Sequence, residues 1–132
     1  MIGNLLKFLK EPEIKGLDID DPKTIEKHRK VIQRKPLLLD AYSSFYKEFK
    51  KISQKVPKGH LIELGSGGGL IKNYLPSVIT SDIIDLDHVD KVFSAENIEV
   101  SDSSVSAFFL LHSFHHIKNP SKFFNEMQRC LK

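Results

Sequence analysis

A glutamate followed by a run of glycines stands out as the segment whose residue types could do chemistry. Residues 63–69 read Glu-Leu-Gly-Ser-Gly-Gly-Gly, so that glycines alternate at Gly65, Gly67 and Gly69. A glycine-rich turn after a buried strand lets the backbone approach a ligand closely, because no side chain stands in the way. A helix beginning there would aim its free N–H groups and its positive dipole end at the same ligand.

Such a loop suits either the pyrophosphate of a dinucleotide or the amino-acid end of S-adenosylmethionine, and its spacing favours the second. Dinucleotide binders carry the pattern G-x-G-x-x-G, whose third glycine falls here on Leu70. A carboxylate at Glu63 can bind the cationic amino group of S-adenosylmethionine but would repel a pyrophosphate. Asp82 follows Gly65 by 17 residues and can accept hydrogen bonds from both ribose hydroxyls of an adenosine, which both kinds of cofactor contain.

The elements that must position these residues alternate between strand and helix from residue 60 onward. We expect strands over 60–64, 77–81, 91–94 and 105–111, a short helix over 70–75, and a last helix that begins at Asn119-Pro120. This alternation predicts an α/β, Rossmann-like fold, in which helices flank both faces of a parallel sheet.

Residues 1–58 read as helical and form a separate region. Asp21-Pro22 is a helix start, with Asp as the cap and Pro at the first helical position. Ile25, His28 and Ile32 then share one face. After Pro36 we expect a second helix, whose apolar stripe is Leu38, Tyr42, Phe45, Phe49 and Ile52.

Residues 58–132 resemble the class I S-adenosylmethionine-dependent methyltransferases, in particular the group with the type 11 methyltransferase domain. The likeness rests on residues 63–69, 80–83, 102–107, 114–120, 124–126 and 129–132. It implies methyl transfer from S-adenosylmethionine, which leaves S-adenosylhomocysteine, with the cofactor over the carboxyl ends of strands one, two and four. The cofactor-binding residues that it indicates are Glu63, Gly65, Ser66, Gly67, Gly69, Asp82, Ile83, Ser94, Ala95 and His112. By analogy with the same family, residues 1–58 would be a lid and residues 59–132 the cofactor-binding domain.

Several features depart from the family pattern. Ser94 stands where the family often has an Asp that bonds the adenine amino group, and Ser106 replaces another Asp near strand four. The sequence also stops before the fifth strand and the terminal antiparallel pair of the family fold. We therefore expect an incomplete sheet of order 3-2-1-4, whose apolar strand four forms an exposed edge, and self-association through that edge.

Three histidines follow strand four, at the end of the sheet where the cofactor is expected. His115 and His116 are the first candidates for a general base, if the acceptor needs deprotonation. Ser113, His116 and, on the second N-terminal helix, Tyr46 are candidate acceptor contacts. The alternative is that His112, His115 and His116 cap or pack against the next helix. We predict no metal site, because paired carboxylates and cysteines at suitable spacing are lacking.

Composition narrows the class of protein further. No apolar run approaches the roughly 20 residues that span a bilayer, and no signal peptide is evident, so we expect a cytoplasmic protein. The basic N-terminal half lacks the interleaved aromatics of a nucleic-acid groove. We predict an S-adenosylmethionine-dependent methyltransferase acting on a small-molecule acceptor. The alternatives are a noncatalytic module that binds S-adenosylmethionine or a nucleotide, and an NAD-dependent oxidoreductase.

Overall fold

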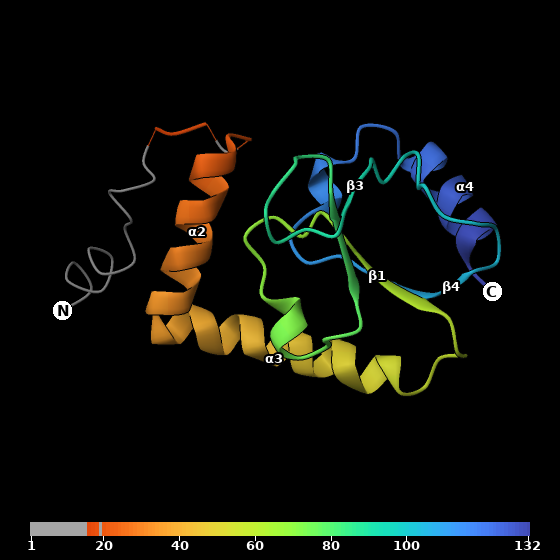
Figure 1. Cartoon of the computed structure of the whole chain (residues 1–132), viewed down its shortest axis with the longest axis horizontal. Helices are drawn as coiled ribbons and strands as arrows, with labels where there is room; N and C mark the ends of the chain where they lie inside the picture. The colour runs from red at the N-terminus through yellow and green to blue at the C-terminus, as the bar shows by residue number, and fades with distance from the viewer. Residues whose placement is uncertain (1–15, 19) are drawn as a thin grey trace.

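The computed structural model describes residues 16–18 and 20–132, in which helices precede a small parallel sheet (Figure 1). The N-terminal helices are α2 (Pro22–Arg34) and α3 (Pro36–Ser53), and the last helix is α4 (Pro120–Cys130). The strands are β1 (His60–Leu64), β2 (Ile79–Asp82), β3 (Lys91–Val92) and β4 (Val105–Phe109). Single 3₁₀ turns lie at Ile71–Asn73 and Phe114–His116.

The sheet confirms the predicted Rossmann-like topology. Within the described residues it has four strands in the order β3-β2-β1-β4, and every neighbouring pair is parallel. Ile62 at the centre of β1 pairs with Ile79 of β2 on one side and with Phe108 of β4 on the other. Because consecutive strands lie on opposite sides of β1, the carboxyl end of β1 is a topological switch point, where open α/β sheets bind ligands.

Apolar side chains cover both faces of the sheet and form two clusters. The cluster on the side of α3 contains Ile32, Tyr46, Leu70, Ile71, Leu75, Val78 and Phe109. The cluster on the side of α4 contains Ile62, Leu64, Phe93, Ile98, Val105, Phe123 and Cys130. Figure 1 shows the strands between α3 and α4, with α2 standing at a steep angle to the start of α3. The predicted arrangement of helices on both faces is therefore confirmed.

Two helix starts follow directly from the sequence. The Asp21 side chain accepts a hydrogen bond from the backbone N–H of Lys23, and Pro22 occupies the first helical position. At α4, Asn119 accepts from the N–H of Lys122 in the same way, and Pro120 follows it. Each side-chain cap satisfies a backbone donor that would otherwise lack an intrahelical partner.

The predicted apolar stripe of α3 is partly correct, because Tyr42 and Phe49 pack against the core cluster, but two of its other members do not. Phe45 and Ile52 are 45% and 48% exposed, whereas Tyr46 is completely buried. Tyr46 stacks on Tyr74, and its hydroxyl accepts the backbone N–H of Leu70 at 2.9 Å. Because that polar contact lies inside the core, the helix turns Tyr46 inward, which the spacing of apolar residues alone could not indicate.

Some element boundaries also differ from the prediction. The helix expected over 70–75 is only the 3₁₀ turn, and the third strand is limited to Lys91–Val92. β4 ends at Phe109 rather than at residue 111. Shortly after it, His112 adopts a positive φ of 57°, a left-handed conformation that a strand cannot continue through.

The outer edge of β4 is partly engaged. Leu131 pairs with Val105, and the N–H of Lys132 donates to the carbonyl of Val105 at 3.0 Å. Phe109 is buried and Phe108 packs partly buried against the cluster on the side of α4. Self-association through this edge remains a prediction. Among the described residues, the helices are all too short or too polar to cross a bilayer.

Candidate cofactor-binding site

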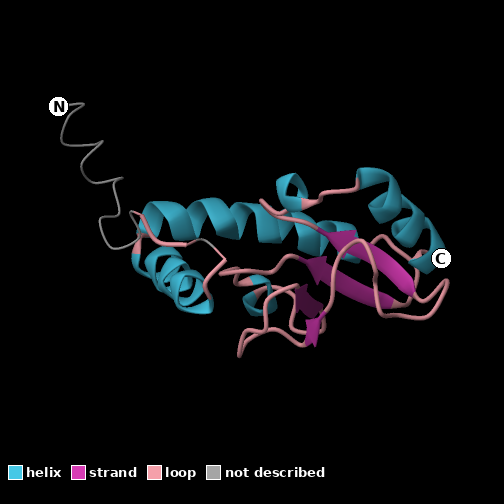
Figure 2. Cartoon of the chain, turned by 90° about the horizontal axis from the view of Figure 1, so that it is seen from above, coloured by secondary structure: helices cyan, strands magenta, loops and turns pink. Residues whose placement is uncertain are grey.

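A pocket of about 800 Å³ lies at the carboxyl ends of β1, β2 and β4, and residues of α2 and α3 line part of its wall. Its volume falls in the range of roughly 300–1,000 Å³ that small-molecule sites occupy. Figure 2 shows the strands from above, with the N-terminal helices lying alongside the sheet. The lining includes every residue predicted to bind the cofactor: Glu63, Gly65, Ser66, Gly67, Gly69, Asp82, Ile83, Ser94, Ala95 and His112.

The glycines of the loop serve different purposes. Gly67 has a φ of +44°, and a β-carbon built there would meet no atom closer than 4.0 Å, so this residue is open to a ligand. Gly65 has a φ of +66°, but its β-carbon would lie 2.5 Å from the Cβ of Ser113. Gly65 is therefore required by the close approach of the chain that follows β4, as well as by its own conformation.

The last two glycines of the run face the N-terminal helices. A β-carbon on Gly68 would lie 3.1 Å from the backbone nitrogen of Arg29 in α2. One on Gly69 would lie 2.7 Å from the hydroxyl of Tyr46 in α3. These glycines permit α2 and α3 to dock on the loop, a purpose that the alternating pattern did not suggest.

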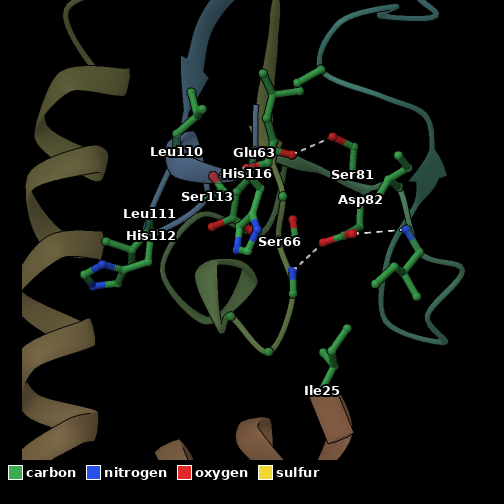
Figure 3. A pocket seen from close by; sticks show the side chains of 18 of the residues that line it. Ile25, Glu63, Ser66, Ser81, Asp82, Leu110, Leu111, His112, Ser113 and His116 are labelled. Atoms are coloured by element: carbon green, nitrogen blue, oxygen red, sulfur yellow. Dashed lines mark hydrogen bonds between the residues drawn. The ribbon is translucent and has the colours of Figure 1, made fainter. Parts of the chain in front are cut away.

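Asp82 joins the end of β2 to the glycine loop. Its Oδ2 accepts the N–H of Gly67 at 2.8 Å and its Oδ1 accepts the N–H of Ile84 at 3.1 Å, as the dashed lines in Figure 3 mark. The residue is only 7% exposed. Each carboxylate oxygen retains a lone pair, so that the oriented group can still accept hydrogen bonds from a pair of hydroxyls.

Glu63, at the floor of the pocket, is a buried carboxylate with a free oxygen. The residue is 2% exposed, and its Oε2 has no hydrogen-bond partner among the described residues. Burial, followed by the charge of Asp82, raises the pKa of the Glu63 carboxyl to about 7. An orphaned buried carboxylate is costly unless a donor arrives, and a cationic amino group supplies both donors and charge. The donor set therefore fits the amino-acid end of S-adenosylmethionine.

Two side chains hold the loop by its carbonyl oxygens. The Nε2 of His88 lies 2.6 Å from the carbonyl oxygen of Gly67, and since a carbonyl only accepts, the ring nitrogen is the donor. On the other side, Nη1 of Arg29 donates to the carbonyl of Gly69. Sequence reasoning missed both contacts. His88 lies in the loop after β2 and Arg29 on α2, and no local pattern marks either residue as a partner of the glycines.

The chain that follows β4 forms the wall opposite Asp82. The Oγ of Ser113 donates to the carbonyl of Leu64 at 2.9 Å, which ties this segment to the end of β1. His112 places its ring centroid 6.0 Å from that of Tyr42 and 6.0 Å from that of Phe45. The left-handed backbone of His112 thus accompanies an aromatic contact between the segment after β4 and α3 at the rim of the pocket.

The predicted acceptor and base residues lie in different environments. Ser113 and His116 line the pocket, whereas His115 does not, although its ring centroid is only 4.1 Å from that of His116. Tyr46 borders the pocket but is 0% exposed, and its hydroxyl is engaged by Leu70. His116 therefore belongs to the pocket wall, and His115 lies outside the lining.

Ser94 and its neighbours close the side of the pocket beyond β3. The Ser94 hydroxyl accepts the N–H of Glu96 at 3.1 Å, and Glu96 accepts the N–H groups of Lys118 and Asn119 at 2.9 and 3.0 Å. Ile83 lines the pocket with 71% of its surface exposed. In the part of the chain that the structure describes, no group of three His, Cys, Asp or Glu side chains could hold a metal ion.

Comparison with known proteins agrees with this geometry. Residues 62–132 match the family described as Methyltransferase domain. The match covers more than half of the chain, and the chain belongs to this methyltransferase family. No curated protein sequence matched the chain.

A solved structure shares the fold. It is the crystal structure of a candidate S-adenosyl-L-methionine-dependent methyltransferase from Methanococcus maripaludis, with a TM-score of 0.63 and 15% sequence identity. The similarity covers 89% of this chain and 62% of that one. The chain thus spans under two thirds of the length of the structure that it resembles. Together, family and fold define a class I methyltransferase architecture, as the sequence predicted.

Proposed function

We propose that the chain binds S-adenosylmethionine in the pocket at the ends of β1, β2 and β4 and transfers its methyl group to a small-molecule acceptor. The observation that carries the proposal is the orphaned, buried oxygen of Glu63, which faces the same pocket as the oriented carboxylate of Asp82. One carboxylate suits the amino group of the ligand and the other its ribose hydroxyls. Membership of the methyltransferase family supports the same ligand.

Each pocket residue has a defined part in this proposal. Glu63 orients the amino group, and Gly67 lets the backbone approach the amino-acid end of the ligand. Asp82 holds the ribose, and the exposed side chain of Ile83 offers the adenine an apolar surface. Ser94 and Ala95 border the adenine side.

The chemistry requires orientation more than acid–base assistance. S-adenosylmethionine carries its methyl group on a sulfonium, which is already activated for displacement. The acceptor's O, N or C atom forms the new bond as the sulfur–carbon bond breaks, and S-adenosylhomocysteine leaves. Correct alignment alone can provide effective molarities of roughly 10⁵–10⁸ M. His116 is the candidate base for an acceptor that must lose a proton, and Ser113 the candidate contact. His115, outside the lining, would act only through His116.

The N-terminal helices would complete the site as a lid. Ile25 and His28 of α2 and Tyr42 of α3 line the pocket, although they precede the predicted cofactor-binding domain at residues 59–132. A lid over the acceptor would exclude water from the reacting atoms. This assignment applies to the described part of residues 1–58.

Calorimetric titration with S-adenosylhomocysteine, S-adenosylmethionine and NAD tests the proposal. We expect both sulfur ligands to bind and NAD not to bind, since Glu63 would repel a pyrophosphate. Binding of NAD alone would point to an oxidoreductase and overturn the proposal. Methyl transfer is tested separately with methyl-labelled S-adenosylmethionine and the small-molecule fraction of a cell extract. Ligand binding without transfer to any component would favour the noncatalytic binding module.

A further inference from the structure

The N-terminal helices contact the glycine loop at three consecutive residues. Gly68 lies against the backbone of α2, where its β-carbon would be 3.1 Å from the nitrogen of Arg29 and 3.3 Å from the carbonyl oxygen of Ile25. The carbonyl of Gly69 accepts a hydrogen bond from the Arg29 guanidinium. The N–H of Leu70 donates to Tyr46 of α3 at 2.9 Å. The loop is therefore held from outside the sheet by side chains of both helices.

Arg29 also places a permanent positive charge beside the floor of the pocket. A β-carbon on Gly69 would lie 3.7 Å from Oε1 of Glu63, so the guanidinium and the Glu63 carboxylate approach the same loop residue. The charge of Arg29 opposes the rise in the pKa of Glu63 that burial and Asp82 cause. A guanidinium stays protonated at all physiological pH values, so this influence is constant.

We propose that Arg29 is a positioning residue of the cofactor site, which fixes the carbonyl of Gly69 and favours the charged form of Glu63 that binds the amino group of S-adenosylmethionine. This inference rests on the proposed function and deepens it. It assigns the N-terminal helices a direct part in cofactor binding, beyond covering the acceptor.

The groups that act on Glu63 fix the direction of the expected pH effect. Burial above all, and then Asp82 on β2, raises the pKa of Glu63, whereas Ser66 and, to a smaller extent, Arg29 on α2 lower it. Tyr42 and Tyr46 on α3 also interact with Glu63, but burial above all, and then Glu63 itself, raises the pKa of both phenols, so they stay neutral near pH 7. Loss of the Arg29 charge therefore moves the ionisation of Glu63 to higher pH.

The experiment compares Arg29→Gln and Arg29→Lys with the wild-type chain by titration with S-adenosylhomocysteine between pH 5.5 and 9. Affinity should rise with pH as Glu63 ionises. Arg29→Gln should weaken binding about tenfold at pH 7, the effect of losing one charged hydrogen bond, and shift the half-maximal pH upward. Arg29→Lys keeps the charge but lacks the planar guanidinium group. This variant should bind S-adenosylhomocysteine more weakly while keeping the wild-type half-maximal pH.

A matched control and a ligand-free readout separate this inference from the proposed function. Lys30→Gln removes the same charge from the neighbouring residue of α2, whose ammonium pairs with Glu26 at an exposed site, and should change nothing. The ¹³C shift of the Glu63 carboxyl, assigned with Glu63→Gln, reports its ionisation without ligand. An unchanged Glu63 titration in Arg29→Gln overturns the inference even if S-adenosylhomocysteine binds. A shifted titration without any ligand binding supports the electrostatic link but overturns the proposed function.

Discussion

The Oδ2 of Asp82 lies 2.8 Å from the backbone nitrogen of Gly67, so the end of β2 fixes the turn that follows β1. The other carboxylate oxygen is held by the N–H of Ile84 at 3.1 Å. Both bonds exist in the free protein. The carboxylate is therefore oriented before a ribose arrives, which reduces the entropy lost on binding.

Asp82→Ala should weaken S-adenosylhomocysteine binding by at least roughly tenfold, because charged hydrogen bonds contribute about 1.5–3 kcal/mol each. Isothermal titration calorimetry at pH 8 measures the change. Asp85→Asn, an exposed carboxylate in the following loop, is the control and should bind like the wild type. Equal affinity for Asp82→Ala and wild type would show that this carboxylate does not hold the ribose.

Gly65→Ala and Gly67→Ala should separate packing from ligand contact. Both glycines have positive φ, so each alanine introduces backbone strain of about 1 kcal/mol. Only Gly65→Ala also collides with Ser113, which should add about 1–3 kcal/mol to the loss of stability. Gly67→Ala should instead reduce S-adenosylhomocysteine affinity more than stability. Urea denaturation and calorimetry on both variants test this contrast.

Removing the side chain of Ser113 supplies a rescue test for the same contact. The double variant Gly65→Ala/Ser113→Gly eliminates the Cβ–Cβ contact at 2.5 Å and should recover the steric part of the loss. The strain of the left-handed alanine, and the hydrogen bond from Ser113 to Leu64, would not return. Purely additive losses in the double variant would contradict the proposed contact.

Glu63→Gln should stabilise the free protein at pH 8 while weakening its affinity for S-adenosylhomocysteine. The folded-state pKa of Glu63 is raised from 4.5 to about 7. The stability that the neutral carboxyl contributes to the fold is therefore fully present below pH 4.5 and is lost as pH rises through 7. This difference in pKa corresponds to a change in the free energy of unfolding of at most about 3 kcal/mol. Urea titrations should show a gain over wild type at pH 8 and little gain at pH 4.5. No dependence on pH would contradict the burial of an ionisable group at this site.

Glu126 should make the protein sensitive to acid. Hydrogen bonds from Arg129 are the main cause that lowers the pKa of Glu126 to about 2, and the N–H of Ile98 adds to them. The resulting stability is present above pH 4.5, the ordinary value, and is lost as pH falls toward 2. Thermal melts between pH 5 and 2.5 should therefore fall less steeply for Glu126→Gln than for wild type. Glu99→Gln, at an exposed position, should keep the wild-type slope.

Much of the sheet could be predicted because its signals are local. β-branched and apolar runs marked the strands, and Asp21-Pro22 and Asn119-Pro120 marked helix starts with a known cap chemistry. The order of strands came from the resemblance to the methyltransferase family. The same resemblance indicated the cofactor-lining residues, which occupy the carboxyl ends of those strands.

The contacts between the N-terminal helices and the loop could not be predicted, because they depend on tertiary packing. Tyr46 carries a hydroxyl that accepts the N–H of Leu70, 24 residues away in sequence, and this places Tyr46 in the core beside Tyr42 and Phe49 of the expected stripe. Arg29 reaches the carbonyl of Gly69 across 40 residues. A charged residue on a helix gives no sign in the sequence of which backbone group it will bind.

The close approach of Gly68 to the backbone of α2 has a consequence for how such proteins diverge. A side chain at position 68 would push the helix away, whereas it would leave the ligand side of the loop at Gly67 untouched. Relatives that replace α2 with a different N-terminal segment would lose the reason for a glycine there. We therefore expect Gly68 in relatives that have the α2 helix, and Gly67 in relatives that bind the same ligand.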